Sequence, residues 1–454
     1  MKNIFVKTLG CKVNTFDSHA LENQFKEKGF TLVEQQEHAD ITVINTCSVT
    51  AVAEKEARYL LRRYKRENPE SFRVVTGCYA QIESGTLTDM DEVDFVVPNE
   101  VKSSLVDMVS DRVSGRGQDA PESGKLPEGI KEVRENRQQH FKSSLTLFDS
   151  PRSERTRAFL KIQDGCNGFC SYCQIPWARG ASRSVDPAQV LAQVKKLAAD
   201  DVPEIVLTGI HIGDYGEDLG LEGKGQALFL DLLQKIFDEP GVKRVRISSL
   251  EPAELTSGLI QVLAKNRDKF CAHFHLPLQS GDDRILKLMN RSYTSARYYE
   301  SVTMIRDYFP DAQITADVIP GFPGETDEAF NQTVEFIKKC GLSSLHVFPY
   351  SKRPNTAALR MPGHVDPGVK KTRAAFLRSL SDDMAANYAR QFFGQSAVVL
   401  WEKKNESLNR WEGKTRNYIQ VMGPESFEAF SGMESTVSLK GFLDRGKVLA
   451  IPQS

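Results

Sequence analysis

The chain lacks the features that mark secreted, membrane-spanning or strongly charged proteins. No stretch approaches the roughly 18 uninterrupted apolar residues that a membrane-spanning helix needs, and the apolar run at the N-terminus is too short for a signal peptide. The 59 basic and 60 acidic residues give a net charge of −1, which excludes a basic footprint spread over the whole chain. These absences predict a cytoplasmic protein with no membrane partner, in which any contact with nucleic acid is made by local basic patches.

Low-complexity tracts and short-period repeats are also absent. At 454 residues the chain is too long for one hydrophobic core, so two or three domains are expected. The 8 cysteines are expected to be free thiols or metal ligands, because disulphides are rare in the cytoplasm.

Strands and helices alternate in the first part of the chain. The predicted strands are Ile4–Thr8, Ile41–Asn45 and Arg73–Thr76, and the predicted helices are Asp17–Lys28 and Ala51–Glu67. This alternation predicts a parallel α/β domain over residues 1–113. Residues 114–151 are polar and rich in glycine and proline, which predicts a linker.

The alternation continues over residues 152–391 and changes near the C-terminus. Six βα units predict a partial (β/α)6 barrel that is open on one side. Its predicted strands are Ala158–Ile162, Glu204–Leu207, Arg244–Ser248, Ala272–Leu276, Gln313–Val318 and Ser344–Phe348. Residues 394–454 are predicted to form a small antiparallel β-barrel. Its predicted strands are Ala397–Glu402, Tyr418–Val421 and Thr436–Leu439.

Three cysteines lie close together directly after the first predicted barrel strand, in Asp164-Gly165-Cys166-Asn-Gly-Phe-Cys170-Ser-Tyr-Cys173. Thiolates are ligands for iron–sulphur clusters and for zinc. A structural zinc site would need a fourth ligand nearby, and the next histidine, His211, is far along the chain. The spacing therefore favours a four-iron cluster in which three thiolates leave one iron free.

Small and polar residues follow the later barrel strands. Active sites of such barrels are built at the carboxyl ends of the strands, so these residues are candidate contacts for a cofactor. They are Thr208, Gly209, Ser248, Glu251, Gln279, Gly321 and Gly324. A glycine after a strand commonly means only a tight turn, and it is their recurrence at successive strand ends that favours a pocket.

The three N-terminal cysteines are far apart in sequence, yet each follows a predicted strand. Cys11, Cys47 and Cys78 come after the first, second and third strands of the N-terminal domain. The carboxyl ends of parallel strands share one edge of the sheet, so three thiolates can converge there. Because buried cysteines are also common in strands, position alone leaves convergence and core packing both open.

Two sets of motifs resemble known families. The Cys-x3-Cys-x2-Cys loop resembles the radical S-adenosylmethionine (SAM) superfamily over about residues 156–391. The N-terminal motifs resemble the methylthiotransferases, which share the domain order of cluster domain, radical SAM barrel and RNA-binding TRAM barrel. These motifs are Gly10-Cys11-Lys12-Val13-Asn14, Asn45-Thr46-Cys47-Ser48-Val49-Thr50 and Thr76-Gly77-Cys78.

The resemblance implies two 4Fe-4S clusters with different roles. The catalytic Cys166, Cys170 and Cys173 would hold the cluster that binds SAM and cleaves it to a 5′-deoxyadenosyl radical. Cys11, Cys47 and Cys78 would hold a second cluster that carries the sulphur to be methylated and transferred. Such chemistry suits an aromatic C–H, which has no useful acidity, so a cofactor must carry the difficult step. An electron donor such as flavodoxin or ferredoxin is implied, and Cys271 and Cys340, which match no ligand position, are expected in the core.

The sequence around Cys11 resembles one branch of the methylthiotransferases. That branch acts on N6-threonylcarbamoyladenosine at position 37, next to the anticodon, in the anticodon stem-loop of tRNA. The implied reaction adds a methylthio group at C2 of that base. A cation such as Lys12 or Arg179 is a candidate partner for the threonyl carboxylate. The alternatives are isopentenyladenosine in tRNA, an aspartate of a ribosomal protein, or a non-enzymatic iron–sulphur RNA-binding protein. Two tricysteine sites that both lack a fourth ligand disfavour the last.

Candidate RNA contacts are scattered. The basic ones lie on the second N-terminal helix, before the barrel and beside the cysteine loop: Arg58, Arg62, Arg63, Lys65, Arg66, Arg152, Arg155, Arg157, Arg179 and Arg183. The C-terminal domain adds three aromatic residues that are candidates for base stacking, Trp401, Trp411 and Tyr418, of which at least one is expected in the hydrophobic core instead.

Overall fold

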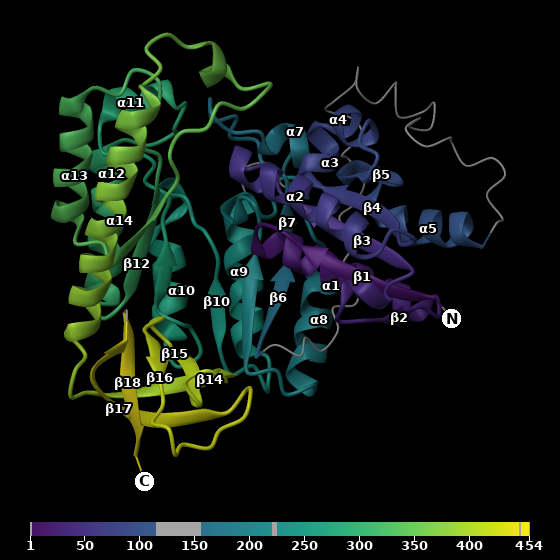
Figure 1. Cartoon of the computed structure of the whole chain (residues 1–454). Coiled ribbons are helices and arrows are strands. Elements are labelled where there is room, and N and C mark those ends of the chain that lie inside the picture. Colours follow the sequence, from purple (N-terminus) through teal and green to yellow (C-terminus); the bar gives the residue numbers. More distant parts are fainter. Residues whose placement is uncertain (1, 115–155, 220–224, 445, 454) are drawn as a thin grey trace. The chain divides into compact units, whose positions relative to one another are not determined.

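The computed structural model describes residues 2–114, 156–219, 225–444 and 446–453 (Figure 1). The predicted linker, residues 114–151, lies outside the described residues except for Ser114. The chain divides into two compact units. The first comprises Met1–Pro151, Lys161–Val185 and Ser351–Leu359, and the second comprises Arg152–Leu160, Asp186–Tyr350 and Arg360–Ser454.

The first unit is built on a parallel five-stranded sheet of order β2-β1-β3-β4-β5. Its strands are β1 (Asn3–Thr8), β2 (Thr31–Leu32), β3 (Ile41–Thr46), β4 (Phe72–Gly77) and β5 (Phe95–Pro98). Its helices are α1 (Lys12–Glu27), α2 (Ala51–Glu67), α3 (Cys78–Ile82), α4 (Ser84–Thr88) and α5 (Leu105–Val113), with the 3-10 turns η1 (Gln36–His38) and η2 (Asn99–Ser104). The predicted parallel α/β fold is confirmed.

Alternate residues of the central strand β3 enter two separate cores. Val43 packs with α1 and α5 on one face of the sheet, whereas Ile44 packs with α2 on the other. All six residues of β3 are buried, as expected for a strand that is covered on both faces. The helix predicted to begin at Asp17 begins instead at Lys12, because burial of Val13 and Phe16 outweighs the weak helix preference of the first turn.

The first unit also contains the cysteine loop. The short strands β7 (Gln163–Asp164) and β8 (Arg183–Ser184) pair antiparallel, and the loop and helix α7 (Ile175–Arg179) lie between them in sequence. Residues 351–359 support the loop from the far end of the chain. The Ala358 N–H donates to the Ser171 carbonyl at 2.8 Å, and the Gln174 amide donates to the Pro354 carbonyl at 2.8 Å.

The second unit contains two three-stranded parallel sheets, ordered β10-β9-β6 and β11-β12-β13. The strands are β6 (Arg157–Lys161), β9 (Glu204–Thr208), β10 (Val245–Ile247), β11 (His273–His275), β12 (Gln313–Val318) and β13 (Ser344–Val347). Bridges between Val245 and Phe270 and between Ser249 and His275 link the two sheets.

Helices follow these strands, as the βα rhythm predicts. They are α8 (Pro187–Ala199), α9 (Gly225–Asp238), α10 (Ser257–Lys265), α11 (Asp283–Leu288), α12 (Ser295–Tyr308), α13 (Asp327–Cys340) and α14 (Pro367–Arg390), with the 3-10 turns η4 (Ile212–Asp214) and η5 (Pro252–Glu254). The 3-10 turn η6 (Ala357–Arg360) belongs to the first unit except for its last residue. All six predicted strands are present, and Cys271 and Cys340 are buried core residues, as expected.

The C-terminal domain is a closed barrel of order β14-β15-β16-β18-β17, drawn in yellow tones in Figure 1. Its strands are β14 (Ser396–Asn405), β15 (Arg410–Thr415), β16 (Gln420–Met422), β17 (Glu434–Asp444) and β18 (Lys447–Pro452), of which β15 and β18 were not predicted. Neighbouring strands are antiparallel except for the pair β16–β18. Contacts between this barrel and the βα strands fall at the amino ends of those strands, where Arg244 pairs with Glu434 at 2.7 Å.

Of the three candidate base-stacking aromatic residues, Trp401 is a core residue, and Trp411 and Tyr418 are half-buried. Trp401 is fully buried and donates its indole N–H to Ser435 Oγ at 2.8 Å. Trp411 packs against the same barrel core. Tyr418 stacks on His273 with ring centroids 4.4 Å apart, and the Arg246 guanidinium lies 4.6 Å from its ring centroid. In the described part of the chain, no helix has the length and apolar character to cross a bilayer.

Candidate metal centres

The cysteine loop begins at a glycine that no other residue could replace without strain. Gly165 has φ +76°, and a Cβ there would lie 1.9 Å from the Ala181 carbonyl oxygen. A Cβ at Gly168 would lie 3.4 Å from Cys166 Sγ and 3.9 Å from Cys170 Sγ, so the backbone of Gly168 leaves a space beside both sulphurs. Backbone N–H groups point at two of the thiols, Gly168 to Cys166 Sγ at 3.3 Å and Ile175 to Cys173 Sγ at 3.4 Å.

These features fit a multi-iron cluster better than a single metal ion. Gly168 lies close to the sulphurs of both Cys166 and Cys170, and its missing side chain leaves the inner side of the loop open. Three thiolates with backbone N–H donors are the typical ligand environment of an iron–sulphur cluster. All three cysteines are partly exposed, so a group bound by their sulphurs would be accessible to a cofactor.

The N-terminal cysteines lie at adjacent strand ends of the first unit. Cys47 directly follows β3, Cys78 is the first residue of α3 after β4, and Cys11 caps the start of α1. Glycine allows the close approach: Gly10 has φ +100°, and a Cβ there would lie 2.9 Å from Cys47 Sγ. Burial raises the pKa of the Cys47 thiol to about 12, and the neighbouring Cys78 and Cys11 thiols add to that shift. The three cysteines thus follow neighbouring parallel strands at one edge of the sheet, as predicted.

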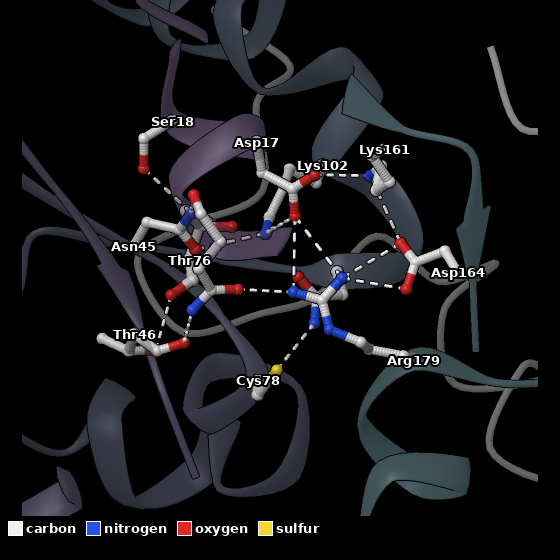
Figure 2. Close-up of polar contacts among 12 residues, drawn as sticks. Asp17, Ser18, Asn45, Thr46, Thr76, Cys78, Lys102, Lys161, Asp164 and Arg179 are labelled. Carbon is white, nitrogen blue, oxygen red and sulfur yellow. Dashed lines mark hydrogen bonds and ion pairs between the residues drawn. The ribbon is translucent and has the colours of Figure 1, made fainter. Parts of the chain in front are cut away.

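A buried network of charged side chains lies beside Cys78 (Figure 2). The Arg179 guanidinium donates to both carboxylate oxygens of Asp164, at 2.9 and 3.0 Å, and to Asn14 Oδ1. It also pairs with Asp17 Oδ2 at 3.4 Å. The Lys161 ammonium bridges the same two carboxylates, at 2.5 Å from Asp17 Oδ1 and 3.3 Å from Asp164 Oδ2.

Lys102 completes the network, at 3.3 Å from Asp17 Oδ2 and 3.2 Å from Asn45 Oδ1. Three cations therefore face two carboxylates, and no side chain among the five is more than 11% exposed. Burial opposes the charge on Asp164, but Arg179 and Lys161 lower the pKa of this carboxyl to about 2. With all five side chains ionised the network carries one positive charge in excess, and burial, opposed by Asp17, lowers the pKa of Lys102 below its ordinary value.

Arg179, one of the three cations of the network, lies next to the Cys78 and Cys11 thiols. Burial acts against the charge of Arg179, yet Asp164, the Cys78 thiol and Asp17 together hold the pKa of Arg179 well above its ordinary value. A cation among thiols stabilises their thiolate forms, which are the forms that bind iron.

The same network fixes the backbone around the cysteines. The Asn14 amide donates to the Leu9 carbonyl at 2.8 Å and to the Thr46 carbonyl at 2.9 Å, which ties the segments before Cys11 and Cys47 together. The Asn99 amide donates to Cys78 Sγ at 3.7 Å and to the Ala178 carbonyl at 2.9 Å.

The expectation that Arg179 contacts RNA or the threonyl carboxylate is wrong. Its side chain is 2% exposed and its guanidinium is held by Asp164, Asp17 and Asn14. Sequence reasoning missed Asp17, Lys102 and Lys161. The role of Asp17 could have been suspected, because it lies beside Phe16 on the buried side of α1, where an unpaired carboxylate would be costly. The two lysines gave none.

The candidate cofactor contacts of the second unit differ in character. Among the described residues, Ser248 Oγ and Gln279 Oε1 are buried without a hydrogen-bond partner, as expected of groups that await a ligand. Gln279 also has φ +62°, a strained conformation for a residue with a side chain. Thr208 is buried at the end of β9, and Gly209 follows it.

The other three candidates have structural explanations. Glu251 is paired with Arg291, so its carboxylate is already engaged. Gly321 has φ +77°, and a Cβ there would lie 2.1 Å from Lys370 Cγ. Gly324 has φ +83° and donates its N–H to the Gly363 carbonyl at 2.8 Å. Both glycines are required by the tight turn in which they lie.

Comparisons with known proteins agree with this geometry. Residues 160–337 match the Radical SAM superfamily, and residues 3–98 match the Uncharacterized protein family UPF0004. The threonylcarbamoyladenosine tRNA methylthiotransferase MtaB of Bacillus subtilis is 40% identical over 93% of this chain and 90% of its own length. The protein of the same name from Aquifex aeolicus is 38% identical over 91% of this chain and 95% of its own.

Related proteins with another substrate in their name also match. The tRNA-2-methylthio-N(6)-dimethylallyladenosine synthase of Syntrophus aciditrophicus is 33% identical over 88% of this chain and 84% of its own. Among solved structures, the radical SAM methyltransferase TsrM from Kitasatospora setae superposes with a TM-score of 0.55 at 14% identity, covering 79% of this chain and 77% of that one. This likeness concerns the fold alone.

Proposed function

The chain belongs to the tRNA methylthiotransferases of the radical SAM superfamily, and on that premise we propose that it holds two 4Fe-4S clusters. The first is held by Cys166, Cys170 and Cys173, and the second by Cys11, Cys47 and Cys78. Its substrate is N6-threonylcarbamoyladenosine in tRNA, which it methylthiolates at C2. This is the activity for which the relatives at 40% and 38% identity are named, and the isopentenyl-type relatives reach 33%.

The observation that carries the two-cluster proposal is the pair of open tricysteine sites within one compact unit. In each site a glycine lies against the sulphurs: Gly168 leaves space beside Cys166 Sγ and Cys170 Sγ, and Gly10 allows its backbone to approach Cys47 closely. The first cluster with bound SAM supplies a radical that can remove hydrogen from an unreactive carbon. Within the second unit, the buried and unpaired Ser248 Oγ and Gln279 Oε1 are candidate hydrogen-bonding groups for SAM.

The second cluster is supported by the charge around it. A three-thiolate 4Fe-4S cluster in its oxidised state carries one negative charge, and the Asp17–Lys102–Lys161–Asp164–Arg179 network carries one positive charge in excess. Pairing the two lowers the cost of burying either. We expect the enzyme to act in the cytoplasm on the anticodon stem-loop, with electrons from a flavodoxin or ferredoxin.

One experiment tests both parts. The enzyme is reconstituted anaerobically and incubated with SAM, dithionite and tRNA carrying either threonylcarbamoyladenosine or isopentenyladenosine, and digested nucleosides are measured by mass spectrometry. The wild type should bind about eight irons and methylthiolate the first tRNA. Methylthiolation of the isopentenyl tRNA alone would contradict the substrate.

Two triple variants separate the clusters. Replacing Cys166, Cys170 and Cys173 with Ala should abolish 5′-deoxyadenosine formation and leave about four irons. Replacing Cys11, Cys47 and Cys78 with Ala should leave 5′-deoxyadenosine formation intact and abolish methylthiolation. Methylthiolation that survives the second set would rule out the N-terminal cluster as the sulphur carrier.

A further inference from the structure

The sheet β11-β12-β13 of the second unit has an apolar face and a polar one. Residues alternate between the two faces, and Phe274 on the apolar face packs against Phe270 and Phe309. His275, Asp317 and His346 lie on the polar face, where Asp317 is directly opposite His346 in the strand register. These three residues come from three adjacent strands and lie close to the carboxyl end of each.

One carboxylate oxygen orients both imidazoles. Asp317 Oδ1 lies 3.2 Å from His275 Nε2 and 3.3 Å from His346 Nδ1, and the two rings stack with centroids 5.0 Å apart. His275 uses its second nitrogen as well, because Nδ1 lies 2.9 Å from Thr315 Oγ1. The contacts of His346 occupy Nδ1, so its Nε2 is the nitrogen left for a ligand.

Exposure increases along the set. The side chain of His275 is 13% exposed, that of Asp317 is 26% exposed and that of His346 is 57% exposed. Burial opposes the charge on Asp317, but hydrogen bonds from His275 and His346 hold the pKa of this carboxyl below its usual range. Asp317 is thus an ionised acceptor that fixes the orientation of an outward imidazole, in the way that carboxylates orient catalytic and metal-binding histidines.

The set adjoins the candidate cofactor contacts. The Leu250 N–H donates to the His275 carbonyl at 3.0 Å, and the Gln279 N–H donates to the Asp317 carbonyl at 2.8 Å. The segment that contains Ser248 and the turn that contains Gln279 are therefore attached to the same strands. Reacting groups gather at the carboxyl ends of barrel strands, and the C-terminal β-barrel contacts the opposite ends.

We propose that His346, oriented by Asp317 and His275, hydrogen-bonds the threonylcarbamoyl arm of the substrate through Nε2 and so selects a polar arm over an apolar one. The proposal rests on the substrate assigned above. A threonylcarbamoyl arm carries hydroxyl, carboxylate and amide groups that can pair with an imidazole, whereas an isopentenyl arm offers none. A site built to hydrogen-bond its substrate discriminates against an analogue that leaves its polar groups unpaired. In this assignment His346 contacts substrate, and Asp317 and His275 are positioning residues.

The test compares His346→Phe, which keeps a ring and removes the nitrogens, with His346→Gln, which retains a hydrogen-bonding group. Asp317→Asn tests positioning, and His38→Phe, at an exposed histidine of the first unit, is the matched control. Each reconstituted enzyme is assayed for kcat and KM on a threonylcarbamoyl anticodon stem-loop and for its Kd toward that stem-loop and an unmodified one. 5′-Deoxyadenosine formation without RNA and the melting temperature report cofactor chemistry and folding.

His346→Phe should raise KM about tenfold or more, the effect of losing one good hydrogen bond to substrate, and remove the preference for the modified stem-loop. His346→Gln should recover part of the lost affinity and preference. The His346 variants should keep wild-type SAM cleavage and melting temperature, and His38→Phe should match the wild type in every assay. An unchanged KM and preference in His346→Phe would overturn the assignment. So would a stoichiometric divalent metal beyond the cluster iron that disappears in His346→Phe, because the same three groups can ligate an ion. Failure of the wild type on the threonylcarbamoyl stem-loop would instead overturn the substrate, and the wild-type assay alone reveals it.

Discussion

Replacing Arg179 with Met should destabilise the first unit even when no cluster is present. The substitution keeps the length of the side chain and removes hydrogen bonds to Asp164 and Asn14 and the ion pair to Asp17. Breaking a buried ion pair costs about 3–5 kcal/mol. Two lysines still face the two carboxylates after the change, so the network stays neutral and the lower value, about 3 kcal/mol, applies.

The measurement is the thermal unfolding of the cluster-free protein. For a cooperative unit of about 150–250 residues, a loss of about 3 kcal/mol lowers the melting temperature by about 6–12 °C. Arg63→Met is the matched control, because Arg63 forms an exposed ion pair with Glu67, and such pairs contribute about 0.5 kcal/mol or less. Equal melting temperatures for the two variants would refute the reasoning.

Arg179→Lys separates the charge of Arg179 from its geometry. Lysine keeps the cation but lacks the planar fork that contacts Asp164 and Asn14 together, so only part of the stability should return. In the reconstituted enzyme, Arg179→Met should make the N-terminal cluster harder to reduce, because an adjacent positive charge favours the more negative, reduced state. Arg179→Lys should stay close to the wild-type potential. A potential that is the same in all three proteins would show that the network does not act on that cluster.

Three further predictions follow from single observations. The pKa of Asp164 is about 2 in the folded protein against an ordinary 3.8, so its ion pairs should stabilise the fold fully above pH 3.8 and less as the pH falls toward 2. Acid unfolding curves should show this loss of stability in the wild type and much less of it in Asp164→Asn. Identical curves for the two proteins would contradict the prediction. Gly168→Val should fill the space beside Cys166 Sγ and lower the iron content by roughly half. Gly85→Val should keep full iron, because a Cβ added at Gly85 would meet no atom within 4 Å beyond its own helix backbone. Full iron in both variants would count against the cluster position. Ser248→Ala should raise the KM for SAM about tenfold, the value of one hydrogen bond, if its unpaired hydroxyl binds the cofactor; an unchanged KM would remove Ser248 from that pocket.

The sheet edge that gathers the N-terminal cysteines could be predicted because few physical rules decide it. Buried runs such as Ile41–Thr46 fix the strands, and parallel pairing places their carboxyl ends together. How close the cysteines lie within that edge depends on how closely the neighbouring backbone segments approach one another. The sequence indicates this approach only through the glycines before Cys11 and Cys78. The strands β15 and β18 of the C-terminal barrel were missed because their polar and apolar residues alternate weakly and their pairing is decided by barrel closure.

The charge network could not be predicted from local patterns. Lys102 and Lys161 lie far from Asp17 in sequence, one in the 3-10 turn η2 and the other at the end of β6, and neither local sequence indicates a buried ion pair. The position of Arg179 beside the cysteine loop marked it as a candidate functional residue. The predicted role, a contact with RNA, was wrong, because the charge of a residue does not show whether it is exposed. Long-range ion pairs are specified by the packing of elements and become visible only when that packing is known.

The network also makes the two cysteine sites depend on one another. Asp164 lies two residues before Cys166, and Arg179 ends the helix that follows Cys173, so the network binds the first cluster loop at both of its ends. Its other partners, Asn14 and Asp17, belong to the helix that starts immediately after Cys11. Replacing a cysteine removes a ligand of one cluster and should lower the iron content of that site. Replacing Asp17 with Asn weakens the network that holds both loops, so it should lower the iron content at both sites. Iron analysis of Asp17→Asn in the two cysteine-triple backgrounds measures each site separately. Loss at one site only would show that the two loops are held independently.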